Sequence, residues 1–145
     1  MLATSVTLLS SWTDVTDASA SEASEAFERV RRRFGGVKPL LAIDENGRVQ
    51  LTRQIDPLQS YELETLHLLS FDPAHGKLAD VAFPYWFVRM KLSDTMNLGT
   101  MVSIMAQDWQ GMDLRVTEED LEALGPTLLL EQSLAGGARI MLWTE

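Results

Sequence analysis

Few side chains in this chain of 145 residues have the chemistry of an acid–base site. The two histidines are His67, which stands among leucines in the run YELETLHLLSF, and His75, which shares the turn-like run DPAHGK with the preceding Asp72. Imidazole is a frequent general base because its pKa lies near neutral pH. If these three side chains faced one cleft, they could exchange protons. A half-buried, hydrogen-bonded His67 and a solvated His75 explain the same residues, so all three remain candidates and no catalytic residue is assigned.

Other motifs of catalysis and ligand binding are missing from the sequence. There is no P-loop pattern and no G-x-S-x-G elbow. With no cysteine and only two histidines, the chain lacks the usual ligands of a zinc site. The run DENG at residues 44–47 begins like a calcium loop but lacks the later ligands, and it suits a hairpin turn better. We therefore expect no metal and no cofactor, and the sequence leans against an enzyme.

The charge of the chain narrows the choice of partners. The net charge is −9 and the isoelectric point is near 4.6. Phosphate neutralisation drives nucleic-acid binding, so we expect no nucleic acid, whereas a basic partner would be attracted. No apolar run approaches the roughly 20 residues of a membrane helix, and the first residues lack the charged region of a signal peptide. We expect no membrane contact and, without cysteine, a cytoplasmic location.

The strongest candidate for a binding surface is the aromatic stretch FPYWFVRMK, residues 83–91. With a period of two from Tyr85 onward, it predicts a strand whose core-facing side chains are Trp86, Val88 and Met90. The opposite face would carry Tyr85, Phe87, Arg89 and Lys91. A sheet with helices on one side leaves its other face to water or a partner, and protein interfaces are enriched in Tyr and Arg. We therefore predict an interface at these four residues. A strand buried on both faces is the alternative.

Helices and hairpins with clear start and stop signals must position these residues. A helix is predicted after Ser19, which forms a capping box with Glu22 and is followed by apolar residues at helical spacing up to Phe34. Gly35-Gly36 ends it. A second helix is predicted over 95–109, and a short helix is predicted over 117–125 with Thr117 as the cap. Hairpins are predicted over 39–54, with a turn at Asn46-Gly47, and over 127–143.

The arginine run RVRRRF in the first helix does not by itself indicate nucleic acid. Arg29 stands four residues after Glu25, and Arg32 stands four residues after Glu28. This spacing predicts ion pairs within the helix and a solvated face. Contact with an acidic partner or a phosphate is the alternative.

Two segments are less clearly marked. Residues 58–70 fit a helix or a strand, and the turn and strand-like run that follow favour the strand. Residues 4–9 suggest a short strand, and the polar residues 11–24 suggest a loop that leads into the first helix.

Together these elements predict a single α+β domain over residues 1–145, with residues 1–18 as a peripheral segment. Its antiparallel sheet of about five to seven strands is built from hairpins, with helices mainly on one face. The preferred functional hypothesis is a small acidic, non-enzymatic binding or regulatory module that acts through a protein interface. A homodimer is the favoured form, and another protein is the alternative partner. One alternative is a small enzyme or small-ligand binder with a pocket near His67. Another is an acidic inhibitor or immunity-type protein against a basic partner.

Overall fold

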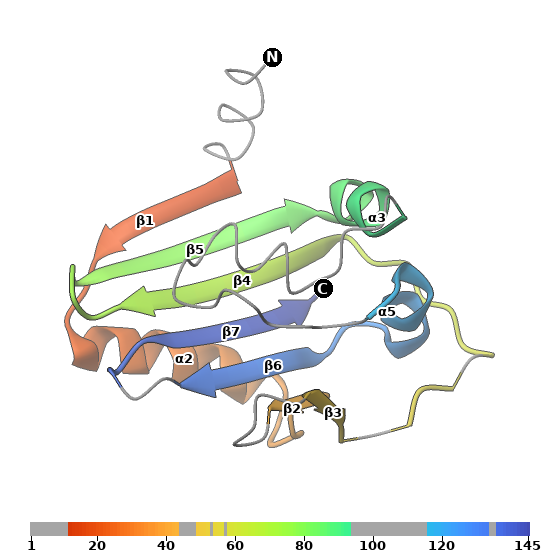
Figure 1. Ribbon diagram of the computed structural model, residues 1–145, viewed down its shortest axis with the longest axis horizontal. Coiled ribbons are helices and arrows are strands. Elements are labelled where there is room, and N and C mark those ends of the chain that lie inside the picture. Colours follow the sequence, from red (N-terminus) through yellow and green to blue (C-terminus); the bar gives the residue numbers. More distant parts are fainter. Residues whose placement is uncertain (1–11, 44–48, 53, 57, 94–115, 134–135) are drawn as a thin grey trace, which may run out of the picture.

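A computed structural model describes residues 12–43, 49–52, 54–56, 58–93, 116–133 and 136–145. The strands are β1 (Thr13–Asp17), β2 (Leu41–Ile43), β3 (Val49–Leu51), β4 (Thr65–Asp72), β5 (Lys77–Pro84), β6 (Leu128–Ser133) and β7 (Arg139–Thr144). The helices are α2 (Ala20–Arg33), α3 (Tyr85–Ser93) and α5 (Glu118–Leu124). Five strands form an antiparallel sheet in the order β1-β5-β4-β7-β6, and β2 and β3 form a second, two-stranded sheet (Figure 1). The predicted α+β class is confirmed.

Strand β4 lies in the middle of the larger sheet and contributes to the core on both faces. It pairs with β5 on one side and β7 on the other. Leu66 and Leu68 belong to one buried cluster, and Leu69 and Phe71 belong to the other. Side chains alternate between the faces of a strand, so this short apolar run supplies both clusters. The preference for a strand within residues 58–70 is therefore correct from Thr65 onward.

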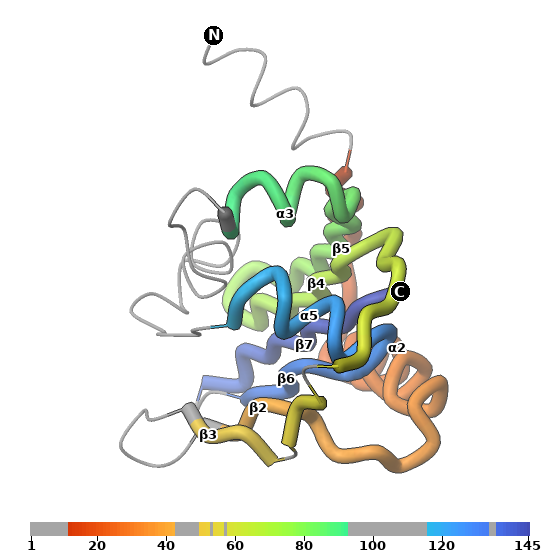
Figure 2. Tube along the Cα trace, turned by 90° about the vertical axis from the view of Figure 1, so that its right-hand side faces the viewer, coloured from red at the N-terminus to blue at the C-terminus, as the bar shows by residue number. Residues whose placement is uncertain are grey.

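Helix α2 covers one face of the sheet (Figure 2). It begins at the predicted capping box, in which the Ser19 hydroxyl accepts from the Glu22 N–H and the Glu22 carboxylate accepts from the Ser19 N–H. Phe27 is fully buried against the sheet, and the Arg139 guanidinium lies 4.4 Å from its ring centre. The capping box satisfies two backbone donors at the helix start, and the apolar stripe supplies the packing that holds the helix in place.

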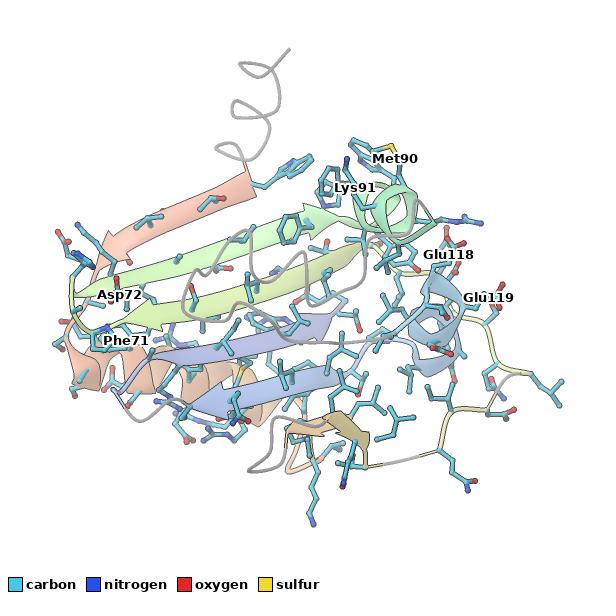
Figure 3. All side chains as sticks on the ribbon, in the orientation of Figure 1. Phe71, Asp72, Met90, Lys91, Glu118 and Glu119 are labelled. Atoms are coloured by element: carbon cyan, nitrogen blue, oxygen red, sulfur yellow. The ribbon has the colours of Figure 1, made fainter. Side chains whose placement is uncertain are left out.

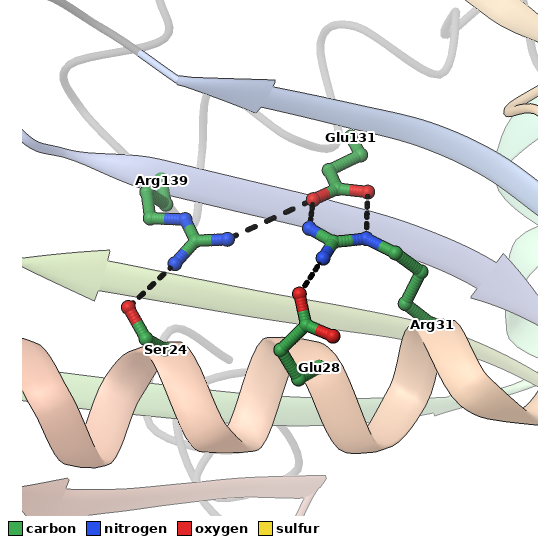
Figure 4. Close-up of polar contacts among 5 residues, drawn as sticks. All are labelled: Ser24, Glu28, Arg31, Glu131 and Arg139. Atoms are coloured by element: carbon green, nitrogen blue, oxygen red, sulfur yellow. Dashed lines mark hydrogen bonds and ion pairs between the residues drawn. The ribbon is translucent and has the colours of Figure 1, made fainter.

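An ion-pair network fixes the outer side of α2 to the sheet (Figure 4). Arg31 contacts Glu131 through both carboxylate oxygens, with Nε 3.0 Å from Oε2, and it also pairs with Glu28. Arg139 lies 3.7 Å from Glu131 Oε1 and donates to the Ser24 hydroxyl at 3.1 Å. Glu28 thus pairs with the arginine three residues later, in place of the predicted partner four residues later.

Some of the other local predictions are confirmed, and others concern residues outside the described ranges. Helix α5 has its predicted cap at Thr117, which forms a capping box with Asp120. The hairpin β6–β7 and the pairing of β2 with β3 are confirmed. The turn at Asn46-Gly47, the helix over 95–109 and the strand over 4–9 lie outside the described residues.

One prediction at the start of the chain is wrong, because Thr13–Asp17 forms strand β1 and not a loop. The strand lies at the edge of the sheet beside β5, and four of its five residues are exposed. An edge strand needs no apolar alternation when solvent meets most of its side chains. The polar sequence of β1 therefore carried no signal of a strand.

The strand predicted from Tyr85 is also wrong, because residues Tyr85–Ser93 form helix α3. The strand that was expected to start after Pro84 instead ends there, at the last pair with β4. The backbone of Pro84 points away from β4 at this position, since its partner Thr65 bonds to Glu145 on the other side, so the missing N–H costs no ladder bond. The Tyr85 N–H then donates to the Glu64 carbonyl at 2.9 Å, and the helix follows. The same apolar residues also fit the helical period, with Tyr85 and Val88 buried three residues apart.

Thr144→Val is expected to lower the free energy of unfolding by about 1–3 kcal/mol, because it leaves two buried backbone groups without this partner. The Thr144 hydroxyl accepts from the Thr127 N–H at 3.0 Å and donates to the Gly125 carbonyl at 3.0 Å, and the residue is 1% exposed. Urea denaturation measures the change. Thr16→Val, on the exposed edge strand, is the control and should change stability little. Equal effects of the two substitutions would contradict the role of the buried hydroxyl.

Candidate functional site

The structure separates the three acid–base candidates. Asp72 is the last residue of β4 and His75 lies in the turn that follows, with His75 Nδ1 2.6 Å from Asp72 Oδ2. This hydrogen bond lowers the pKa of Asp72, as does the hydrogen bond that the Asp72 carboxylate accepts from the Ala74 N–H. His67 stands five residues before Asp72 in the strand, about 17 Å away at about 3.3 Å per residue, and the odd spacing puts it on the opposite face. Asp72 and His75 therefore form a turn contact that does not include His67.

His67 has an unusual environment of its own. Its ring stacks on the Trp143 ring with a centroid distance of 4.8 Å and an interplanar angle of 5°. Both His67 ring nitrogens and Trp143 Nε1 are buried without a hydrogen-bond partner in the described part of the chain. His67 Nε2 lies 3.1 Å from Glu145 Oε2, but the contact lacks hydrogen-bond geometry. An unsatisfied buried polar atom costs about 1–3 kcal/mol, so three of them together require an explanation.

A cleft of about 250 Å³ lies beside His67, between α2 and the sheet. Asp14 and Asp80 line it from opposite positions on the paired strands β1 and β5. Although much of the Asp80 side chain is open to solvent, lost hydration of the carboxylate raises its pKa. Asp14 and Glu145 raise that pKa further, whereas His67 lowers it. The cleft thus brings the Asp14 and Asp80 carboxylates together, and no described residue forms an ion pair with either of them.

A second, wider hollow of about 520 Å³ lies between α3 and α5. Its lining comes from three elements: Tyr85, Trp86, Arg89 and Met90 of α3, Glu118 and Glu122 of α5, and Glu62 and Leu63 before β4. Figure 3 shows Met90 and Lys91 on α3 and Glu118 on the side of α5 that is turned toward α3. Trp86 is 59% exposed and Met90 is 48% exposed, one helical turn apart. We call this hollow the α3–α5 groove.

Polar contacts fix the walls of the α3–α5 groove. Arg89 Nε donates to Glu118 Oε2 at 3.2 Å, and the Tyr85 hydroxyl donates to the Glu118 carbonyl at 3.3 Å. Burial raises the pKa of Tyr85, and the nearby Glu122 raises it further, so this phenol stays protonated. A protonated Tyr85 can keep donating to the backbone of α5. The groove therefore has a fixed polar wall beside an exposed apolar one.

The four residues predicted as an interface are distributed differently from the expected strand face. Tyr85 is 8% exposed and packs in the core of the protein. Phe87 is half-buried, with its ring centre 4.8 Å from that of Trp12, and Lys91 Nζ lies 5.7 Å from the Phe87 centroid. Arg89 alone of the four lines the groove with an exposed side chain.

The core assignment of Trp86 and Met90 is wrong, whereas Val88 is fully buried as predicted. A helical reading of the same stretch would have found this, because Trp86 and Met90 then share a face that Val88 does not. The proline before Tyr85 was the available signal for a helix start.

Two other features bear on the chemistry. Among the described residues, no group of three or more His, Asp or Glu side chains is arranged to hold a metal ion. None of the helices within the described ranges has the length and apolar character needed to cross a membrane.

Asp80→Asn is expected to stabilise the protein at neutral pH by roughly 0.2–1 kcal/mol, because it removes one of two like charges at opposed strand positions. The raised pKa means that the folded protein holds this proton more tightly than the unfolded chain. The stability contributed by Asp80 therefore falls as the pH rises from the ordinary carboxyl pKa through the raised value.

Urea denaturation of both proteins across acidic and neutral pH measures this difference. The advantage of the Asn variant should vanish below the ordinary pKa of Asp, where the carboxyl is protonated in both states. A variant that is equally favoured at every pH would show that the charge of Asp80 is not the cause.

Comparison of the chain with protein-family models, with curated proteins and with solved structures finds no match. Its function has to be inferred from the geometry of these two sites.

Proposed function

We propose that the protein is a non-enzymatic binding module whose α3–α5 groove holds a basic, partly apolar segment of another protein. The observation that carries the proposal is the exposed pair Trp86 and Met90 beside the carboxylates of the groove. Large exposed apolar side chains rimmed by polar groups are typical of interaction sites. Tryptophan is also among the residues that contribute most to binding when a partner covers them.

The Trp86 ring is held in place before any partner binds. Its centroid lies 6.1 Å from that of Trp12 and 6.1 Å from that of Phe87, in edge-to-face geometry. Aromatic pairs of this kind are favourable, so they restrict the rotamers of the ring. A side chain that is already ordered loses less conformational entropy on binding. Trp86 is therefore suited to anchor a partner.

Charge favours a basic partner over a second copy of the chain. Three carboxylates line the groove, from Glu62, Glu118 and Glu122, against one guanidinium, from Arg89, which already pairs with Glu118. The whole chain carries a net charge of −9. Complementary charge speeds association and selects partners, whereas a second copy would bring the same acidic surface. A basic segment with an apolar residue for Trp86 and Met90 meets both requirements.

The proposed location is the cytoplasm, because the sequence has no cysteine to form the disulfides of an oxidising compartment. In this setting the module would regulate or inhibit a basic partner protein by covering part of its surface.

Selection from a library of random displayed peptides tests the proposal. Peptides that combine Lys or Arg with Leu, Phe or Trp should be enriched, and their affinity should fall as salt is raised. In a fluorescence anisotropy titration, Trp86→Ser should weaken a selected peptide by about tenfold or more, because it removes the anchor. Val37→Ser removes another exposed apolar side chain, in the loop after α2, and should change nothing.

Three results would overturn the proposal. Acidic selected peptides would contradict the basic partner, and peptides that bind Trp86→Ser as tightly as the wild type would remove the groove as the site. Sedimentation velocity at micromolar concentration tests self-association. The proposal expects a wild-type monomer, and a dimer that Trp86→Ser converts to a monomer would assign the groove to a second copy.

A further inference from the structure

The cleft beside His67 has features of a binding site that the α3–α5 groove does not share. It lies on the other side of the sheet, under α2, and its volume of about 250 Å³ is below the roughly 300–1,000 Å³ of pockets for drug-sized ligands. An occupant must therefore be a small molecule. The charged groups around the cleft show what its chemistry would be.

The two walls of the cleft carry opposite charge. The sheet contributes Asp14 and Asp80, and neither carboxylate makes a hydrogen bond or an ion pair with a described residue. The helix contributes Arg29 and Arg33. No ion pair joins the arginines to these two aspartates across the cleft, although Arg33 pairs with Glu145 and Arg31 pairs with Glu28 and Glu131. The space between the walls thus suits a ligand with a positive and a negative end.

The carboxylate of Glu145 marks where the negative end of such a ligand would lie. Arg33 Nη1 donates to Glu145 Oε1 at 3.1 Å, and the other oxygen lies 3.1 Å from His67 Nε2. Both Glu145 and Arg33 are exposed side chains, so they can move aside. A ligand carboxylate in this position would meet Arg33 and the buried His67 ring.

The buried rings supply the second, independent sign of a ligand. Trp143 is 3% exposed, lines the cleft, and its Nε1–H has no acceptor in the described part of the chain. Both nitrogens of the stacked His67 ring are also buried without a hydrogen-bond partner among the described residues. An indole N–H can only donate, and a neutral imidazole both donates and accepts. Glu145 Oε2 lies 3.1 Å from His67 Nε2 without forming a hydrogen bond, and a ligand carboxylate in its place could turn an oxygen toward this nitrogen.

We propose that this cleft binds a small zwitterion of the free α-amino acid class. The ammonium group lies between Asp14 and Asp80, which removes the unfavourable facing of two carboxylates on neighbouring strands. The carboxylate takes the place of the Glu145 carboxylate between Arg33 and His67. Aliphatic parts of the ligand contact Leu69 and Leu78 on the same wall.

Titration of the ¹⁵N-labelled full chain with each standard free α-amino acid tests the proposal by NMR. The Trp143 indole resonance, assigned with a Trp143→Phe variant, should shift on binding. At least one amino acid should bind, and its decarboxylated amine and its N-acetylated form should each bind at least about tenfold more weakly, because each lacks one charged end. Asp80→Asn and Arg33→Gln should each weaken binding by about the same factor.

Arg32→Gln is the matched control, since Arg32 is the exposed neighbour of Arg33 on α2 and does not line the cleft. It should leave binding unchanged, as should Trp86→Ser in the separate groove. The zwitterion site is refuted if no free amino acid shifts the Trp143 resonance, or if the amine alone binds as well. It is also refuted if Arg32→Gln and Arg33→Gln have equal effects. Circular dichroism of each variant verifies that the fold is retained.

Discussion

The two-sided burial of strand β4 is the constraint on which the rest of the structure depends. Its run of apolar residues places Leu66 and Leu68 on one face and Leu69 and Phe71 on the other. Each face must be covered, because apolar area left in water costs about 25 cal/mol per Å². Helix α2 covers one face, and buried residues of α3, α5 and β2 join the cluster on the other. The same alternation puts His67 under α2, where the cleft lies.

Elements marked by local chemistry could be predicted from the sequence. The start of α2 follows from Ser19 and Glu22, and the start of α5 follows from Thr117, because each cap acts on backbone groups three residues away. The hairpin β6–β7 follows from two β-prone runs around a glycine-containing turn. These signals depend only on neighbours in the chain. The antiparallel α+β class follows from them directly.

Features that depend on distant residues could not be predicted in this way. The stretch after Pro84 fits both a strand and a helix period, and its contacts with α5 and with the segment before β4 decide for the helix. The exposure of Trp86 and Met90, and thus the groove, follows from that decision. The cleft joins Asp14, Asp80 and Trp143 from three strands that sheet pairing brings together. No spacing in the sequence connects them.

The arginine run of α2 shows how one stretch of like residues is divided by helix geometry. Arg29 and Arg33 are four residues apart and lie on the same side of the helix, so both reach the cleft. Arg31 is rotated by about 200° from Arg29, at about 100° per residue, and reaches Glu131 at the other side of α2. The ion pair of Arg31 with Glu131 resists rotation of the helix about its axis. It therefore helps to hold Arg29 and Arg33 over the acidic wall of the cleft. The total charge of the arginine run does not indicate this division of roles.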